Sequence, residues 1–105
     1  MAKNTLMVIT NISIEEEPRL NLDELCSVCR VTPEFIRDLI EYGILEDAVL
    51  QRNDFRSEHL RRVRIVVHLQ KDLEVNLPGA ALVLDLMDEM EEMRKQLEVF
   101  KKTTF

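Results

Sequence analysis

The chain has 105 residues, of which 46% are hydrophobic and 32% charged, a length that supports one domain with a single core. Two glycines and three prolines are too few for a turn-rich β-sandwich or a glycine-rich phosphate loop. A formal net charge of −6 disfavours binding to nucleic acid, which is itself an anion. The composition therefore predicts a mainly α-helical single domain spanning residues 1–105.

The expected cellular location depends on two sequence patterns, those of a membrane span and of a signal peptide. No apolar run approaches the ~20 residues of a membrane span, and the N-terminus does not have the pattern of a signal peptide. The two cysteines do not form a disulfide framework of the kind found in small secreted domains. We therefore expect a cytoplasmic protein that does not contact a membrane.

The N-terminal segment has a strand pattern. Residues 5–14 are rich in β-branched residues, and Leu6 and Val8 begin an alternating apolar face that continues to Ile14. Three glutamates and Pro18 follow, and both the like charges and the proline interrupt a strand. The sequence predicts one short β-strand over residues 5–14.

A helix-turn-helix is predicted over residues 21–43. Asn21 is placed to cap the first helix, and Glu24 three residues later completes a capping box. Thr32 and Pro33 have the pattern of an N-cap followed by the first residue of a second helix. Two short helices joined by a few residues are typical of this motif.

The segment after the second helix has a mixed pattern. Gly43 suits the left-handed residue that ends that helix. Residues 44–56 contain a short apolar run, from Ala48 to Leu50, between polar residues. The pattern favours a small β-hairpin, the wing, able to pair with the N-terminal strand.

Two longer helices are predicted in the remainder of the chain. Ser57 is a candidate N-cap for a third helix over residues 57–73, which we expect to be the best buried. Its predicted buried stripe consists of Leu60, Val63, Val66, Val67, Leu69 and Leu73. A Leu-Pro-Gly turn then leads into a C-terminal helix over residues 78–102, about 37 Å long at 1.5 Å per residue.

The C-terminal helix has a heptad pattern of apolar residues that continues beyond the part of the helix that the domain core can cover. Apolar residues recur at steps of three and four, and the core of so short a chain covers only the first half of the helix. Apolar surface left in water costs about 25 cal/mol per Å². We therefore predict a homodimer whose contact includes Met90, Met93, Leu97 and Phe100; the alternative is a helix that folds back on its own domain.

Catalytic and metal motifs are not expected. Cys26 and Cys29 supply only two of the four ligands of a structural zinc site, and His59 and His68 point in different directions on one helix. A dithiol enzyme places its first cysteine at a helix N-terminus, whereas this pair begins inside a helix. We interpret the cysteines as small core residues and expect no enzyme activity, no cofactor and no metal.

The helix-turn-helix resembles that of the MerR family. In this family a Val-Ser turn precedes an arginine-led helix that ends in Gly-Leu-Leu, and a short signature marks entry from the wing into the third helix. The matching residues are Val31, Thr32, Arg37, Gly43, Ile44 and Leu45, followed by Phe55, Arg56, Ser57, Glu58 and Leu60. The resemblance implies a mainly α, winged helix-turn-helix with a long C-terminal dimerisation helix.

The predicted DNA-reading surface departs from that family. MerR proteins follow the arginine with an aromatic pair, where this chain has Asp38 and Leu39. Residues 20–43 hold two arginines against five carboxylates. Because phosphate neutralisation by Lys and Arg supplies most non-specific DNA affinity, the charge of this helix disfavours DNA as its ligand.

A resemblance to the CbpM family of chaperone modulators covers most of the chain. The order of a truncated MerR-like module, a long apolar helix, the turn at residues 77–79 and the final helix with Leu-Met-Asp-Glu at 86–89 is similar to that family. It implies a dimer that binds the J-domain of a CbpA/DnaJ-like co-chaperone and blocks its stimulation of DnaK. J-domains carry a basic helix that engages DnaK, so an acidic competitor is electrostatically suitable.

The expected partner-binding surface is the exposed side of the second helix. Its candidate contacts are Glu34, Arg37, Asp38, Glu41 and Tyr42. Two alternatives remain open. In a MerR-like transcriptional regulator, Arg30, Arg37 and Arg52 would contact phosphates. In an adaptor, the same fold would serve an unrelated protein.

Overall fold

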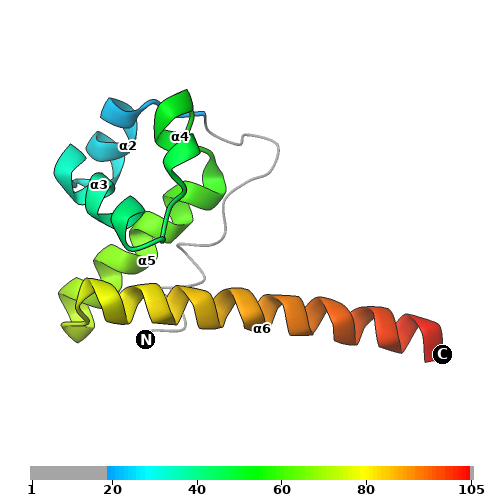
Figure 1. Cartoon of the computed structure of the whole chain (residues 1–105). Coiled ribbons are helices and arrows are strands. Elements are labelled where there is room, and N and C mark those ends of the chain that lie inside the picture. The colour runs from blue at the N-terminus through cyan, green and yellow to red at the C-terminus, as the bar shows by residue number, and fades with distance from the viewer. Residues whose placement is uncertain (1–18, 105) are drawn as a thin grey trace.

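The computed structural model describes residues 19–104, and this range folds into a small bundle with one projecting helix (Figure 1). The described helices are α2 (Leu22–Cys29), α3 (Pro33–Glu41), α4 (Asp47–Arg52), α5 (Ser57–Leu73) and α6 (Leu77–Thr104). The mainly α prediction is confirmed. The predicted strand over residues 5–14 lies outside the described residues.

The helix-turn-helix is confirmed, and local hydrogen bonds explain where its helices begin. The Asn21 side chain accepts a bond of 2.8 Å from the backbone N–H of Glu24, whose carboxylate accepts one of 2.9 Å from the N–H of Asn21. The Thr32 hydroxyl accepts from the N–H of Phe35 at 3.1 Å, and Pro33 is the first residue of α3. Each cap satisfies a backbone donor that the helix itself leaves free.

Left-handed residues end both helices of the motif. Arg30 follows α2 with φ of 57°, and Gly43 follows α3 and its cap Tyr42 with φ of 75°. The chain then turns inward, so that Ile44 and Leu45 are almost fully buried. Gly43 therefore has the role that the sequence predicted.

The wing prediction is wrong within the described residues, because α4 occupies its place. Val49 is buried and the adjacent Leu50 is partly buried, whereas Ala48 and Gln51 on either side are exposed. Neighbouring positions can share one face of a helix, but they point to opposite faces of an alternating strand. Asn53 then ends α4 in the left-handed conformation. The described residues contain only an isolated antiparallel bridge, between Leu20 and Phe55, in place of a hairpin.

The core lies between α5 and the shorter helices. In α5 the buried residues are Leu60, Val63, Ile65, Val66 and Leu69. Val67 is only partly buried and Leu73 is 60% exposed, so the predicted stripe is too long at its C-terminal end. Arg56, not Ser57, is the N-cap, because its backbone N–H donates to Nδ1 of His59 at 2.9 Å.

Helix α6 begins under the bundle and extends beyond it (Figure 1). The Asn76 side chain accepts from the N–H of Gly79 at 2.8 Å, so the predicted turn is the first turn of the helix. A Cβ on Gly79 would lie 2.9 Å from Cγ1 of Val75, which explains the glycine. Within α6, only Ala80 and Leu84 are buried, and residues 88–103 are all exposed.

Candidate protein-interaction surfaces

The predicted partner-binding residues share the outer side of α3. Ile36 and Leu39 of this helix are fully buried, which turns the positions between them outward. Every predicted contact is exposed: Glu34, Arg37, Asp38, Glu41 and Tyr42. We call these five residues the α3 surface.

The α3 surface has a net negative charge that its neighbours do not neutralise. Among the described residues, Glu34, Asp38 and Glu41 form no ion pair. Arg37 is the only basic residue in the helix. Tyr42 is 46% exposed and combines an apolar ring with a polar hydroxyl, a combination favoured at protein interfaces.

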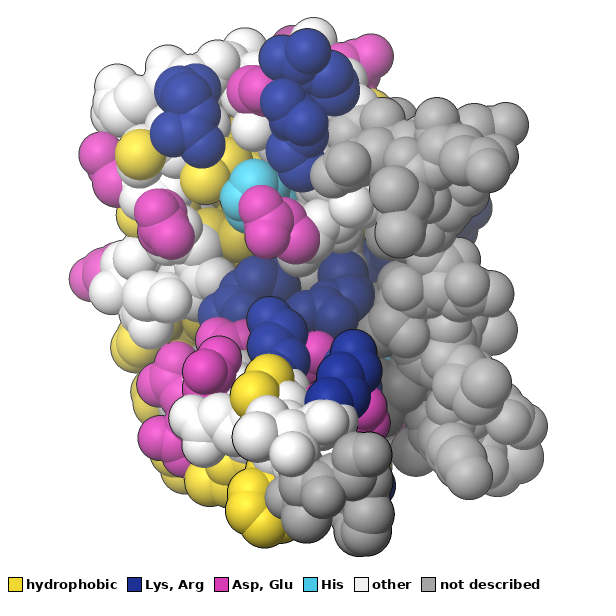
Figure 2. Space-filling model, turned by 90° about the vertical axis from the view of Figure 1, so that its right-hand side faces the viewer, with side chains coloured by type: hydrophobic (Ala, Val, Ile, Leu, Met, Phe, Trp, Pro, Cys, Tyr) yellow, Lys and Arg dark blue, Asp and Glu magenta, His cyan; other side chains and the backbone are white. Residues whose placement is uncertain are grey.

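The predicted dimer residues lie on the projecting part of α6. Met90, Met93, Leu97 and Phe100 are between 53% and 67% exposed, and we call these four residues the α6 seam. Leu82 and Leu86, also exposed, continue the line toward the bundle. Leu82 and Leu86 follow the buried residues Ala80 and Leu84 by two positions, which is about 200° around the helix axis. The seam therefore faces away from the bundle, and Figure 2 shows hydrophobic side chains along the lower edge of the molecule, where α6 lies.

An arginine in α5 holds α6 against the helix-turn-helix. Arg62 donates from Nε to the carbonyl oxygen of Ile44 at 2.7 Å and from a terminal nitrogen to both carboxylate oxygens of Asp88 at 3.1 Å. Its side chain is only 17% exposed. The contact joins α6 to α5 near the point where α6 leaves the bundle. Sequence reasoning missed it, because residues 26 positions apart on separate helices leave no local pattern.

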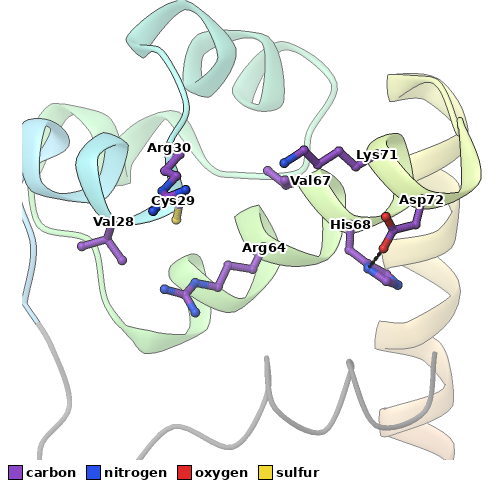
Figure 3. Close-up of a pocket in the computed structure, with 8 residues that line it drawn as sticks. All are labelled: Val28, Cys29, Arg30, Arg64, Val67, His68, Lys71 and Asp72. Atoms are coloured by element: carbon purple, nitrogen blue, oxygen red, sulfur yellow. Dashed lines mark ion pairs between the residues drawn. The ribbon is translucent and has the colours of Figure 1, made fainter. Parts of the chain in front are cut away.

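The cysteines lie at the junction of α2 and α5. Cys26 is 8% exposed within the core and Cys29 is partly buried against it, facing Arg64 of α5 (Figure 3). Burial raises the pKa of both thiols, which favours the unreactive protonated form. Their placement agrees with a structural role. No group of three metal-ligating side chains occurs among the residues that the structure describes.

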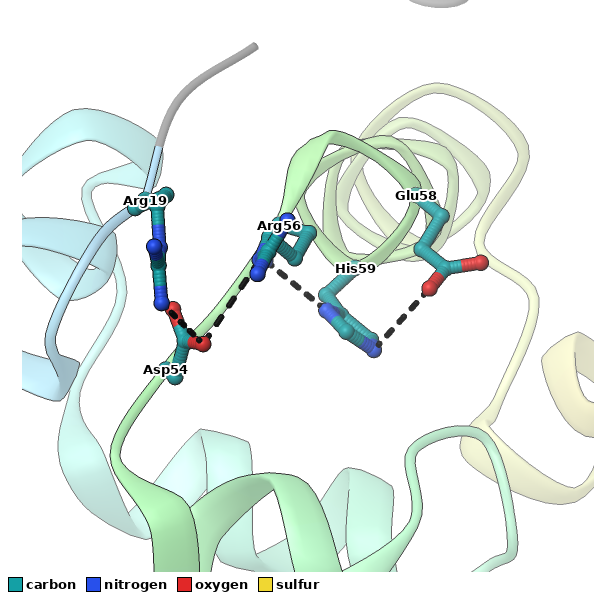
Figure 4. Close-up of polar contacts among 5 residues, drawn as sticks. All are labelled: Arg19, Asp54, Arg56, Glu58 and His59. Atoms are coloured by element: carbon teal, nitrogen blue, oxygen red, sulfur yellow. Dashed lines mark hydrogen bonds and ion pairs between the residues drawn. The ribbon is translucent and has the colours of Figure 1, made fainter.

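A polar network ties the start of the described chain to α5 (Figure 4). Arg19 donates to the Asp54 carboxylate at 3.2 Å, and this contact holds the pKa of Asp54 below its usual value. Arg56 lies 3.6 Å from the same carboxylate. Burial lowers the pKa of His59, whose Nδ1 already accepts the α5 cap bond. These groups are engaged in structural contacts that hold the first described residues and the start of α5 together.

Comparison with known protein families assigns the chain to a class of protein. Residues 20–102, from the β-bridge into the last turn of α6, match the family described as "MerR HTH family regulatory protein". The chain therefore belongs to the MerR helix-turn-helix family. No described helix is both long and apolar enough to cross a membrane.

Within that class, the chain is similar to proteins named "Chaperone modulatory protein CbpM". It is 29% identical to that of Coxiella burnetii (strain Dugway 5J108-111), over 93% of this chain and 94% of the relative. It is 28% identical to that of Pseudomonas putida (strain F1) and 24% to that of Pseudomonas entomophila (strain L48), over 80% of this chain and 85% of each relative. No solved structure matches the chain. Both resemblances predicted from the sequence are thus confirmed.

Proposed function

We propose that this protein is a non-enzymatic chaperone modulator of the cytoplasm, which binds the J-domain of a CbpA/DnaJ-like co-chaperone and inhibits its action with DnaK. The observation that carries the proposal is the similarity to chaperone modulatory proteins CbpM over nearly the full length of both chains. Inhibition would be steric, because a J-domain covered by this protein is unavailable to DnaK.

The α3 surface is the proposed contact with the J-domain. Its carboxylates, which form no ion pair with another described residue, suit a basic helix, since complementary potentials speed encounter and favour the correct partner. Tyr42 would be the amphipathic anchor at the edge of the contact. Long-range attraction of this kind weakens as salt screens the charges.

A homodimer formed through the α6 seam is the second part of the proposal. Burying a Leu, Met or Phe side chain fully is worth about 1.5–3 kcal/mol. The four seam side chains are each more than half exposed, so pairing two copies recovers roughly 1 kcal/mol per side chain. Charged residues flank the seam on α6, which favours a narrow helix-to-helix contact.

DNA binding is the competing function within this family. Its candidate phosphate contacts are Arg30, Arg37 and Arg52, all of which are exposed. The acidic α3 surface opposes it, because the helix that would enter the major groove has three carboxylates and one arginine. The described residues also contain α4 in place of a wing.

Charge reversal on α3 separates the two functions. We expect Asp38→Lys to weaken J-domain binding, with a smaller effect at high salt, because it replaces attraction by repulsion. If α3 faced DNA, the same change would strengthen binding to a random duplex. Glu74→Lys, an equal charge change at the C-cap of α5, is the matched control and should leave J-domain binding nearly unchanged. Tight wild-type binding to a specific duplex and none to the J-domain would reject the modulator in favour of a regulator.

A further inference from the structure

A pocket unrelated to the α3 surface lies between the C-terminal end of α2 and α5 (Figure 3). Its volume is about 380 Å³, within the range of roughly 300–1,000 Å³ typical of small-molecule sites. Val28 and Val67 supply apolar surface from the two helices. The pocket therefore has the size and the wall chemistry of a ligand site.

Three basic side chains line this pocket. Arg64 and Lys71 lie two turns apart on one side of α5, and Arg30 reaches the pocket from the left-handed residue that ends α2. Among the described residues, none of the three forms an ion pair. The carboxylate in the lining, Asp72, is paired with Nδ1 of His68 at 2.7 Å. Among the described residues, three positive charges thus face one carboxylate in the lining, which leaves the pocket basic in a chain whose net charge is −6.

Arg64 also has a buried donor without an acceptor. Its Nε is shielded from solvent and makes no hydrogen bond. Burial raises the pKa of the neighbouring Cys29 thiol more than its contact with Arg64 lowers it, so the thiol stays protonated and supplies no negative charge. A buried donor left unpaired costs free energy that an incoming acceptor recovers.

We propose that this pocket binds a small organic dianion, in which carboxylate or phosphate groups are attached to a compact apolar body. The planar guanidinium of Arg64 matches the paired oxygens of either group, and Lys71 and Arg30 balance the remaining charge. Val28 and Val67 contact the apolar body. The site is independent of J-domain recognition, so either proposal can fail alone.

The adjacent hollow between α5 and α6 provides an internal comparison. Arg61, three residues before Arg64, also has a buried Nε without a hydrogen-bond acceptor. Its hollow, however, is lined by Asp88, Glu91 and Glu92, whose charges repel an anion. Arg61 is therefore the matched control for Arg64, since it is the same residue type on the same helix.

The test is titration of the full chain with phthalate and with phenyl phosphate, followed by calorimetry and by amide NMR shifts. We expect at least one probe to bind with a Kd on the order of a millimolar or tighter, with shifts confined to the end of α2 and the facing turns of α5. The stronger probe identifies carboxylate or phosphate as the preferred group. Neutral phthalamide should not bind, because the attraction is to charge.

Variants then assign the site. Arg64→Gln and Lys71→Gln should each weaken binding about tenfold, because each removes a hydrogen bond between charged groups. Arg61→Gln should leave it unchanged. Lys71 is exposed, so its variant carries the test even if Arg64→Gln unfolds the protein. Binding of neither probe, equal binding of phthalamide, or an equal loss in Arg61→Gln would overturn the proposal.

Discussion

Substitution of Leu97 by Glu is the most informative change in the α6 seam. Leu97 is 53% exposed, so its exposed half is worth about 1 kcal/mol per copy when a second chain covers it, or about 2 kcal/mol in a dimer. Two glutamates without partners at the same contact add roughly 1–3 kcal/mol. The total of about 4 kcal/mol corresponds to a dissociation constant about a thousandfold higher.

Sedimentation measures this change directly. We expect the wild type to sediment as a dimer at micromolar concentration and Leu97→Glu as a monomer with unchanged helix content, since the residue does not contact the core. Gln96→Glu adds the same charge one residue away from the seam and should remain dimeric. A wild type that sediments as a monomer at tens of micromolar would refute the reasoning.

The other predictions concern the bundle. Arg62→Ala should lower the free energy of unfolding, measured in urea, by about 1–2 kcal/mol, because the Ile44 carbonyl and Asp88 lose their donor. An unchanged free energy of unfolding would contradict the stabilising role of the Arg62 contacts. Burial holds the pKa of His59 below its usual value, so the unfolded chain takes up a proton at a higher pH than the folded chain does. The free energy of unfolding should therefore fall as pH drops below about 6.5. His59→Gln should reduce this dependence of stability on pH, and an unchanged dependence would show that other groups produce it. Cys26→Ala combined with Cys29→Ala should cost about 1 kcal/mol through lost core volume and leave J-domain binding intact; one equivalent of metal per wild-type chain in elemental analysis would contradict their structural role.

Local chemistry made the helix-turn-helix predictable from the sequence. The capping box at Asn21 and Glu24, the Thr-Pro start of α3 and the glycine after it each act within a few residues, so neighbouring letters reveal them. The exposed seam of α6 was predictable for a related reason. Its heptad spacing continues past the length that a chain of this size can cover.

Features that depend on distant residues were not predictable in this way. The apolar run before Arg52 fits a strand or a short helix equally well, and the shared burial of the adjacent Val49 and Leu50 favours α4. The hydrogen bonds of Arg62 and the basic pocket beside Arg64 both involve residues from helices that are far apart in the sequence. Asp47 at the start and Arg52 at the end of α4 were the available signal for a helix, since they match its dipole.

Inhibition of the co-chaperone is measured most directly by the stimulation of the DnaK ATPase by a CbpA/DnaJ-like J-domain. We expect the protein to abolish this stimulation at concentrations that saturate the J-domain, while the basal ATPase of DnaK stays unchanged. Asp38→Lys should need a higher concentration than the wild type for the same effect, and Glu74→Lys should not. Full stimulation in the presence of a saturating excess of the wild-type protein would contradict the account.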